Sequence, residues 1–496
     1  MKELNSKQIR WVLLLGALIA WFMHQPFLHD APASQHVWRQ TFTLSVVDNY
    51  YYEDNNLFLP RVDNRGATQG VTGMHFPLYE WVVAQTYHIT GDQLWVHRVW
   101  SFLFTVLGAL ACYYLTRLWF KSETAAAVAF YFYLFSPEMF FNGFIALPDT
   151  LALPLVLWGL VFFYQWWYKK KEFQWVLSAL LFLLGGLVKL QYLGIGFIVA
   201  GTVLRDWKPL KWQEWTRLAG FGLISVVPVL MWYRYSKKLI ESSGMLEVGL
   251  SIKPADSLDF ALYVLKKNFL SDFPELIFGY VALVGFTAAV WFFLKSKKRA
   301  DHPLFLPFAV FVGGFSVYHI LELRVLEHHQ YYMMPYLAFL LPVAAFGLTK
   351  LLKNKPALLA GFLVLHIVLC GFRMIPARFA NENPGIEKEF WNDSMRTALQ
   401  VAIPSDSLIV VGPDESKCIH FYFLKSQGWN FLNEKQLVGV RVNGEVPLDS
   451  MIRRGASYFV THDTSVLNNS SIRARLGQEV KTVGDFKVFR LRSLAR

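Results

Sequence analysis

The sequence is poor in cysteine and in charge. Its three cysteines, Cys112, Cys370 and Cys418, have a spacing that matches no metal-binding motif. Cys112 and Cys370 fall within apolar segments, so the sequence implies no disulfide framework. Charged residues make up 17% of the 496 residues and hydrophobic residues 54%, and the mean hydropathy is +0.32. This composition is too apolar for a soluble protein of this length and indicates a membrane protein.

The sequence also has no visible internal repeat or low-complexity segment. The lack of a repeat argues against the related halves found in many transporters. The first apolar run, residues 11–28, has no small-residue cleavage site and is followed by further apolar runs. We therefore expect it to be retained as the first membrane helix.

Apolar runs long enough to cross a bilayer recur as far as about residue 373. Lysine and arginine concentrate in the short segments between them, as in cytoplasmic loops, so the net charge of +12 reflects orientation in a membrane and not binding of nucleic acid. The pattern predicts a polytopic α-helical membrane protein with a cytoplasmic N-terminus. The predicted spans, about eleven, are 11–28, 94–116, 124–146, 151–168, two short spans within 175–204, 217–233, 273–294, 303–320, 333–349 and 356–373.

The composition changes after the last predicted span. Residues 374–496 are more charged and contain short β-like runs at 407–411, 456–460 and 486–489, separated by helical stretches. We therefore predict a membrane domain over residues 1–373 and a small extracytoplasmic α/β domain after it. The polar loops expected on the outer side of the membrane are 29–93, 234–272 and 321–332.

Three ionisable residues lie at the outer ends of predicted spans. Arg39 can bind a phosphate through two hydrogen bonds, or it can extend to lipid headgroups. Asp149 can cap the helix that follows it, and a carboxylate there can also bind a divalent cation or act as a general base. Lys189 interrupts an apolar run, which makes it a functional candidate because a charge in lipid is costly; snorkelling to the interface is the alternative.

Further polar groups lie in the same outer loops. Asp48 is one of several acids in the first loop, most of which are expected to be solvated. His75 can serve as a metal ligand or a base, or have no role, and His328 and His329 form a second group beside Tyr332. A mixture of cations and a carboxylate at a lipid boundary suits a phosphate-bearing lipid. The cations would neutralise a phosphate leaving group, and the carboxylate would take a proton from an incoming hydroxyl.

Five short strings resemble a known family in their order and spacing: residues 36–43 (HVWRQTFT), 75–79 (HFPLY), 146–149 (ALPD), 187–189 (LVK) and 329–335 (HQYYMMP). The family is that of the bacterial membrane glycosyltransferases of the protein mannosyltransferase and aminoarabinose transferase type, similar to glycosyltransferase family 39. The resemblance implies the GT-C fold and an α/β domain outside the membrane.

The resemblance also implies an activity. It is the transfer of a sugar, with inversion, from a polyprenyl-phosphate carrier to a lipid, glycan or protein acceptor on the outer face of a bacterial inner membrane. Related sequences often carry an acid at the position of Phe42 and a glutamate at that of His75. Since this chain has neither, Asp149 and Asp48 are left as candidate catalytic carboxylates. The residues implied to bind the donor phosphate are Arg39, Lys189, Tyr332, Gln40 and His36.

A divalent metal ion is a further expectation. The candidate ligands are His75, Asp149, His328 and His329. The ion would be zinc, manganese or magnesium, and imidazole ligands favour Zn²⁺ or Mn²⁺ over Mg²⁺.

Two other classes of function are open at this stage. A polyprenyl-lipid flippase or transporter would need polar residues near the middle of several spans, whereas only Lys189 interrupts one here. A non-catalytic scaffold could bind a partner through residues 374–496, although such a protein has little need of the polar outer loops.

Overall fold

The structure, a computed structural model, describes residues 5–208, 210–245, 252–297, 302–381, 384–439 and 447–494. The chain forms two compact units, each built from three stretches of sequence. Unit 1 comprises Met1–Asp30, Leu94–Trp232 and Ser251–Ala380, and unit 2 comprises Ala31–Gln93, Tyr233–Leu250 and Asn381–Arg496. The predicted division at residue 373 stays a prediction.

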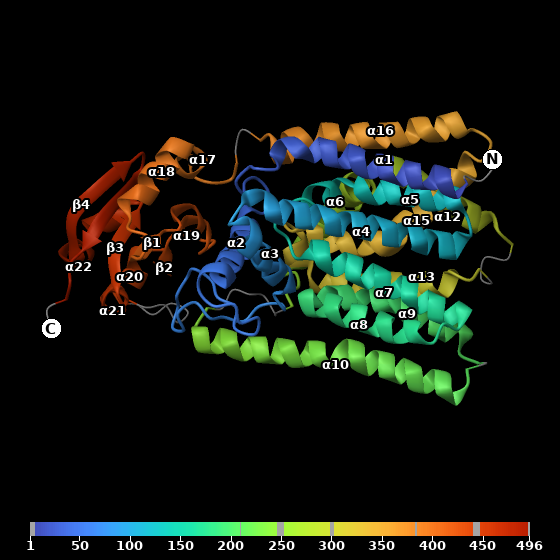
Figure 1. Cartoon of the computed structure of the whole chain (residues 1–496), viewed down its shortest axis with the longest axis horizontal. Coiled ribbons are helices and arrows are strands. Elements are labelled where there is room, and N and C mark those ends of the chain that lie inside the picture. The colour runs from blue at the N-terminus through green and yellow to red at the C-terminus, as the bar shows by residue number, and fades with distance from the viewer. Residues whose placement is uncertain are drawn as a thin grey trace. The chain divides into compact units, whose positions relative to one another are not determined.

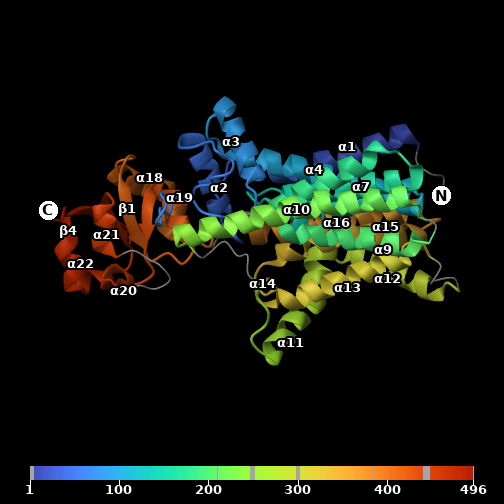
Figure 2. The ribbon, with the colours of Figure 1, turned by 90° about the horizontal axis from the view of Figure 1, so that it is seen from below.

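Unit 1 is helical, and its long helices run roughly side by side in both ribbon views (Figures 1 and 2). Its α-helices are α1 (Ser6–His24), α4 (Leu94–Phe120), α5 (Glu123–Leu134), α6 (Pro137–Asn142), α7 (Asp149–Lys169), α8 (Phe173–Val188), α9 (Gly196–Asp206), α10 (Trp212–Ser243, which ends in unit 2), α11 (Leu258–Lys267), α12 (Val281–Lys295), α13 (Phe305–Leu321), α14 (Leu323–Leu326), α15 (Leu337–Leu351) and α16 (Pro356–Met374). Shorter 3₁₀ or π segments are η1 (Gln25–Phe27), η2 (Leu190–Ile195), η3 (Asn268–Phe278), η4 (Gln330–Tyr336) and η5 (Ile375–Phe379).

The predicted polytopic helical fold is confirmed, and each predicted span overlaps at least one of these helices. The number of helices long enough to cross a membrane is smaller than the eleven spans predicted. Within the described residues, six helices are long and apolar enough to cross a membrane, and a seventh span results if the pair Leu258–Phe278 and Val281–Lys295, bent by 109°, counts as one. α8 and α13 are shorter apolar helices.

Two local features explain why some apolar segments are broken. The predicted span 124–146 divides into α5 and α6 because Ser136, which precedes Pro137, has φ −60° and ψ 123°, and a residue before proline avoids the helical region. α8 ends at Val188, because the next residue, Lys189, has an extended backbone with φ −154° and ψ 112°. The break at Lys189 agrees with the two short spans predicted within 175–204.

Small residues allow close helix packing in unit 1. A Cβ atom at Gly347 of α15 would lie 2.0 Å from the carbonyl oxygen of Gly285 in α12, and one at Gly285 would lie 2.3 Å from the carbonyl oxygen of Ala344. The two backbones are therefore in direct contact, as is common between membrane helices.

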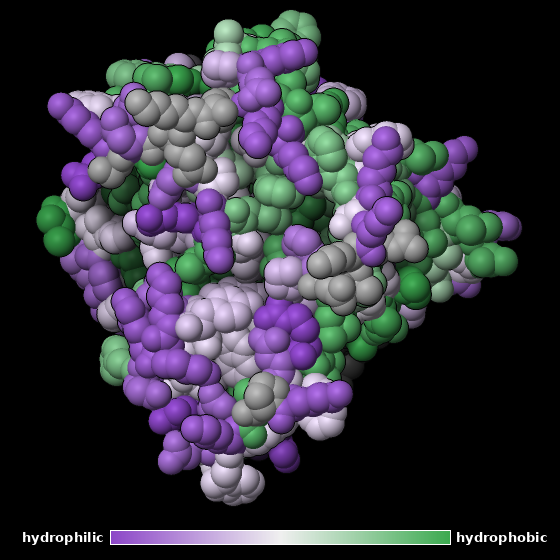
Figure 3. All heavy atoms as spheres, turned by 90° about the vertical axis from the view of Figure 1, so that its right-hand side faces the viewer, coloured by the Kyte–Doolittle hydropathy of each residue, from purple (hydrophilic) through white to green (hydrophobic). Residues whose placement is uncertain are grey.

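One end of unit 1 carries many hydrophilic side chains. Figure 3 shows this end, which is on the right-hand side of Figure 1. Ion pairs join the helix turns in this part of the bundle. Lys170, after α7, lies 2.5 Å from Glu214 at the start of α10, and Arg217 lies 2.9 Å from Glu172. Cations concentrated at helix ends are typical of a cytoplasmic membrane face.

Unit 2 combines helices with one five-stranded sheet. The helices are α2 (Val37–Tyr52), α3 (Leu78–Thr90), α17 (Lys388–Trp391), α18 (Asp393–Ala402), α19 (Ile419–Leu424), α20 (Glu434–Leu437), α21 (Leu448–Arg453) and α22 (Ser470–Arg475), with the 3₁₀ segment η6 (Thr464–Asn468). The strands are β1 (Leu408–Gly412), β2 (Gln427–Asn430), β3 (Ala456–Thr461), β4 (Leu476–Val483) and β5 (Phe486–Leu491). Their order is β2-β1-β3-β5-β4; β2, β1 and β3 are parallel, whereas β5 is antiparallel to β3 and β4.

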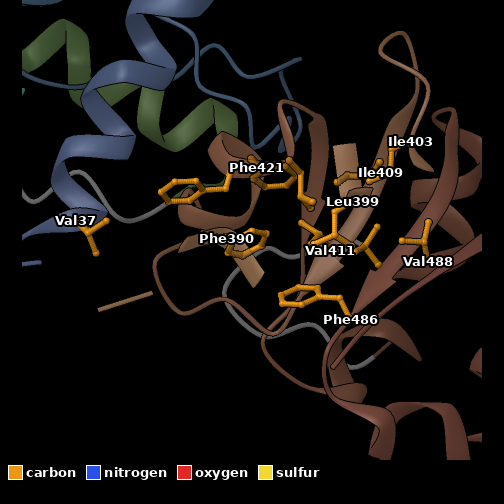
Figure 4. Close-up of a cluster of buried hydrophobic side chains, with 12 residues drawn as sticks. Val37, Phe390, Leu399, Ile403, Ile409, Val411, Phe421, Phe486 and Val488 are labelled. Carbon is orange, nitrogen blue, oxygen red and sulfur yellow. The ribbon is translucent and has the colours of Figure 1, made fainter. Parts of the chain in front are cut away.

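The sheet of unit 2 buries a hydrophobic cluster on each face. Ile409 and Val411 of β1 point into one cluster, together with Val488 of β5 (Figure 4), whereas Val410 belongs to the other. This alternation is the two-residue period of a strand that is covered on both sides. The predicted C-terminal α/β fold is confirmed: the three β-like runs correspond to β1, β3 and β5. The sequence did not indicate β2 and β4, because β2 is short and contains Gly428, and β4 is largely exposed and polar.

Candidate functional site

A group of ionisable and aromatic side chains in unit 1, here called the Asp149 cluster, comprises Asp149, Lys189, Gln191, Tyr192, Tyr331 and Tyr332. Asp149 is the first residue of α7 and is fully buried. The N-terminus of a helix stabilises a carboxylate, because the unpaired backbone N–H groups there carry partial positive charge. Lys189 lies where α8 gives way to η2.

Hydrogen bonds hold the Asp149 carboxylate in place. Its Oδ1 accepts a hydrogen bond from the Tyr192 hydroxyl at 3.1 Å and a long one from Gln191 Nε2 at 3.5 Å. Its Oδ2 lies 3.7 Å from Nζ of Lys189. The carboxylate therefore faces a cation on one side and neutral donors on the other.

The Lys189 ammonium also lies over two aromatic rings. Its Nζ is 5.2 Å from the ring centroid of Tyr332 and 5.8 Å from that of Tyr331. The side chain is 13% exposed, so the cation is largely withdrawn from solvent but is not sealed off. A lysine held in this way can attract an anion such as a phosphate as a point charge.

A second group, the Arg39 array, lies in unit 2 and consists of three buried side chains. Arg39 Nη2 is 3.3 Å from Nδ1 of His75, and Nε2 of His75 is 2.9 Å from Oε1 of Glu80. An arginine only donates hydrogen bonds, so Nδ1 of His75 accepts and its Nε2–H donates to Glu80, which fixes the neutral tautomer of the imidazole. The guanidinium is also 5.4 Å from the ring centroid of Phe42.

Asp48 lies on α2 with Arg39, nine residues further along. At about 100° per residue the two side chains project from opposite sides of the helix. Burial raises the pKa of Asp48 well above its usual range, and the charges of Asp63 and Asp92 add to that shift.

The other predicted donor-binding residues are at the start of α2. His36 adopts a left-handed conformation, with φ +59°, directly before the helix. Gln40 donates from Nε2 to the carbonyl oxygens of Ala33, at 3.1 Å, and Gln35, at 3.2 Å. In the structure Gln40 therefore supports the loop that leads into α2.

The predicted metal ligands are engaged in several different interactions. Both ring nitrogens of His75 have partners in the Arg39 array, and Asp149 is paired with Lys189. His328 is exposed and lies 3.1 Å from Glu327, whereas the ring of His329 is 5.7 Å from that of Tyr331, beside the Asp149 cluster. A metal role for these four residues stays a prediction.

Among the described residues, three ligand-type side chains come together elsewhere in unit 2. Glu387, His420 and His462 place one potential ligand atom each within 4.8 Å of one another. No sequence motif indicates this group, because its members are 33 and 42 residues apart and follow no ligand spacing.

Sequence reasoning also missed Glu80, Gln191 and Tyr192. Gln191 and Tyr192 directly follow the predicted Lys189, and Glu80 is in the first turn of α3. The sequence signal that could have identified them is their polar character close to a predicted site residue.

Comparison with known proteins identifies the fold. Residues 74–232, which include His75, Asp149 and Lys189, match the family model of the dolichyl-phosphate-mannose-protein mannosyltransferases. No curated protein is matched by the sequence. ArnT from Cupriavidus metallidurans, in a crystal structure with undecaprenyl phosphate bound, has a TM-score of 0.67 and 14% identity over 98% of each chain.

Two larger enzymes share the fold over part of their length. The oligosaccharyltransferase AglB from Archaeoglobus fulgidus, in complex with an inhibitory peptide and a dolichol-phosphate, has a TM-score of 0.57 and 12% identity, with 92% of this chain and 70% of AglB covered. The arabinofuranosyltransferase AftD from Mycobacteria has a TM-score of 0.54 and 14% identity, with 99% of this chain and 42% of AftD covered. The expected GT-C fold is confirmed.

Proposed function

We propose that this chain, a membrane protein with the GT-C fold, is a glycosyltransferase that moves a sugar from a polyprenyl-phosphate carrier to an acceptor. The observation that carries the proposal is the Lys189 ammonium, held between the Asp149 carboxylate and the rings of Tyr331 and Tyr332. ArnT was solved with undecaprenyl phosphate bound and AglB in complex with a dolichol-phosphate, and both molecules are polyprenyl phosphates of the expected class.

Lys189 is the proposed ligand of the donor phosphate. When the bond between the sugar and the phosphate breaks, negative charge accumulates on the leaving phosphate oxygens. A cation that is already oriented and largely desolvated stabilises that charge more than it stabilises the ground state. The Tyr332 hydroxyl is proposed as a further phosphate ligand.

Asp149 is proposed to position Lys189. A lysine side chain is flexible, and the carboxylate 3.7 Å from its Nζ restricts where the ammonium can lie. The hydrogen bonds from Tyr192 and Gln191 in turn fix the carboxylate. An anchored carboxylate of this kind keeps the cation ready for an incoming phosphate.

The proton of the acceptor hydroxyl needs a base. Asp149 and Asp48 are the two candidates from the sequence. Asp149 is paired with Lys189, whereas burial raises the pKa of Asp48, which favours the protonated form of that carboxyl group. Both acids stay candidates for the base, and the reaction is proposed to be a single displacement with inversion.

Arg39 is proposed as an additional phosphate ligand. Its guanidinium is oriented by His75, and His75 by Glu80, so the array presents a cation of fixed geometry. Arginine suits phosphate because its planar group can donate two parallel hydrogen bonds.

The proposed location is a bacterial inner membrane, with the N-terminus in the cytoplasm and unit 2 outside. The cations at the helix ends, which include Lys170 and Arg217, support this orientation through the positive-inside rule. Labelling of single cysteines introduced at position 170 and at position 391, where Trp391 is 43% exposed, tests it in intact cells.

The proposed activity is tested with the purified chain and a polyprenyl-phosphate sugar that carries a radiolabel on the sugar. The expected result is release of free polyprenyl phosphate together with labelled product in the presence of a membrane-extract acceptor. Movement of intact donor lipid between the leaflets of a vesicle, without release of phosphate, would instead establish the flippase. If the protein neither releases polyprenyl phosphate nor moves the donor lipid, the result would favour the scaffold.

A further inference from the structure

Glu387, His420 and His462 form a compact group in the C-terminal part of unit 2. His420 Nε2 lies 2.8 Å from Oε1 of Glu387, and the ring centroids of His420 and His462 are 5.4 Å apart. One ligand atom from each of the three side chains fits within 4.8 Å. Two imidazoles and a carboxylate form a ligand set that proteins use for Zn²⁺.

The group lies at a particular place in the sheet. β1 is the central parallel strand, and the chain passes from it through α19 to β2 on one side, whereas β3 pairs on the other side. The order of the strands reverses here, and ligands of open α/β sheets bind at the carboxyl ends of strands at such points. His420 lies on α19, and His462 directly follows β3, so both belong to this edge.

The surrounding contacts orient the ligands. The backbone N–H of His420 donates to Oδ2 of Asp414 at 3.1 Å, in the loop after β1. The rings of Phe390 and Phe486, both labelled in Figure 4, lie 5.2 and 5.4 Å from that of His420. His420 is therefore 1% exposed and set rigidly among aromatic side chains.

Two ring nitrogens in this group have no hydrogen-bond partner in the described part of the chain. They are Nδ1 of His420 and Nδ1 of His462, and both atoms are buried. Buried polar atoms are rarely left unsatisfied, because each one carries a desolvation cost. An ion that draws on these imidazoles would account for part of that cost.

The local charge also favours a cation. Glu389 is 2% exposed, and its Oε1 accepts a hydrogen bond from the backbone N–H of Asp485 at 2.8 Å. Glu387, Glu389 and Asp463 all act electrostatically on His462. Lys388, which lies between Glu387 and Glu389 in the sequence, is exposed, and its ammonium group pairs with Asp485 at 3.0 Å.

We propose that Glu387, His420 and His462 bind a divalent transition-metal ion, with Zn²⁺ as the preferred ion. Three protein ligands leave a fourth position for a water molecule. The Glu387–His420 contact would open when the ion enters between the two groups. The ion would tie the segment before α17 to the loop after β3 and so stabilise unit 2. Mg²⁺ would bind much more weakly, because it prefers oxygen ligands.

The test uses the full-length protein in detergent, stripped of metal with a chelator and then titrated with Zn²⁺ or with Co²⁺ as a spectroscopic probe. Wild-type protein should bind one ion at this site and give the intense visible bands of low-coordinate Co²⁺ with nitrogen ligands. His462→Gln and Glu387→Gln should each weaken binding by at least about 100-fold, because each removes one of three ligands. His88→Gln, at an exposed histidine of unit 2, is the matched control and should bind like wild type.

Thermal unfolding provides a second measurement that does not depend on transferase activity. Zn²⁺ should raise the unfolding temperature of wild-type protein and of His88→Gln, but not that of His462→Gln. His462 is partly exposed, so the metal-free variant should unfold like metal-free wild type. Equal binding by wild type and both ligand variants, or no binding by the wild type, would overturn the proposal. Binding that is lost only in His75→Gln would assign the ion to the Arg39 array instead.

Discussion

Nζ of Lys189 lies 3.7 Å from Oδ2 of Asp149, and the two residues are separated by 40 positions in the sequence. Asp149 is the first residue of α7, and Lys189 directly follows the last residue of α8. The pair therefore lies where α7 and α8 meet, at the end of the bundle away from the turn that joins them. This relationship turns two isolated charges in apolar sequence into a single site.

Lys189→Ala should reduce sugar transfer by about 100- to 1,000-fold, the effect typical of removing one preorganised group that stabilises charge in the transition state. The release of polyprenyl phosphate measures it. Lys350→Ala is the matched control, because Nζ of Lys350 also lies over aromatic rings, 4.6 Å from that of Phe292. Lys350 is near the far end of α15, about 20 Å along the helix from η4. Equal losses in both variants would count against the assignment.

Arg39→Ala and Asp149→Asn should each abolish transfer while the protein still folds. Arg39 supplies the cation of its array, and Asp149 the negative charge that positions Lys189. Gel filtration in detergent checks folding, and the labelled-donor assay checks activity. Wild-type activity in both variants would remove the site assignment.

The Asp149–Lys189 pair should show strong energetic coupling. Lys189→Met leaves a buried carboxylate without its cation, which costs about 3–5 kcal/mol. Adding Asp149→Asn should restore part of that loss, with a coupling free energy of about 1–3 kcal/mol. Unfolding of the two single variants and the double variant in detergent measures the coupling. Strictly additive effects would mean that the two side chains do not interact.

Asp63 should make unit 2 less stable as the pH rises. Burial raises the pKa of Asp63 from 3.8 to about 6, although the hydrogen bonds with Asn49 and Ser45 act to lower it. Between about pH 4 and 6 the carboxyl group of Asp63 is protonated in the folded state but ionised in the unfolded state. Its contribution to the free energy of unfolding is therefore complete below about pH 4 and is lost as the pH rises past about 6. The difference is about 3 kcal/mol.

Asp63→Asn tests this pH dependence, because the amide cannot ionise. The variant should unfold at a higher temperature than wild type at pH 8 but at nearly the same temperature at pH 4. Arg65 and Glu53, which also act on Asp63, are unchanged in the variant. A wild-type advantage at pH 8 would show that the carboxylate is stabilising when charged.

Adding one methyl group at Gly347 should destabilise the contact between α12 and α15. In Gly347→Ala the new Cβ would lie 2.0 Å from the carbonyl oxygen of Gly285, so the helices must separate, at a cost of about 1–3 kcal/mol. Gly361→Ala in α16 is the control, since no atom lies within 4 Å of its added Cβ. Alanine is a better helix former than glycine, so this variant should gain up to about 1 kcal/mol. Thermal unfolding of the two variants should shift in opposite directions.

The type of secondary structure and the chemistry available to each segment follow from its amino acids alone. Long apolar runs must form helices in lipid, where every backbone polar group needs an internal partner, and this fixed the helical character of unit 1. The β-like runs at 407–411, 456–460 and 486–489 indicated the sheet, because strands covered on both faces are continuous hydrophobic segments. Asp149 and Lys189 stood out because charges are rare in such sequence.

Which of these groups come into contact depends on how the helices and strands pack. The contact of Asp149 with Lys189 depends on how α7 packs on α8, and the joining of Glu387, His420 and His462 depends on the order of the strands. The interruptions of the apolar segments at Ser136 and Lys189 likewise set how many helices are full length. Side-chain chemistry is local to a residue, whereas contacts between distant residues arise from packing, which no short stretch of sequence encodes.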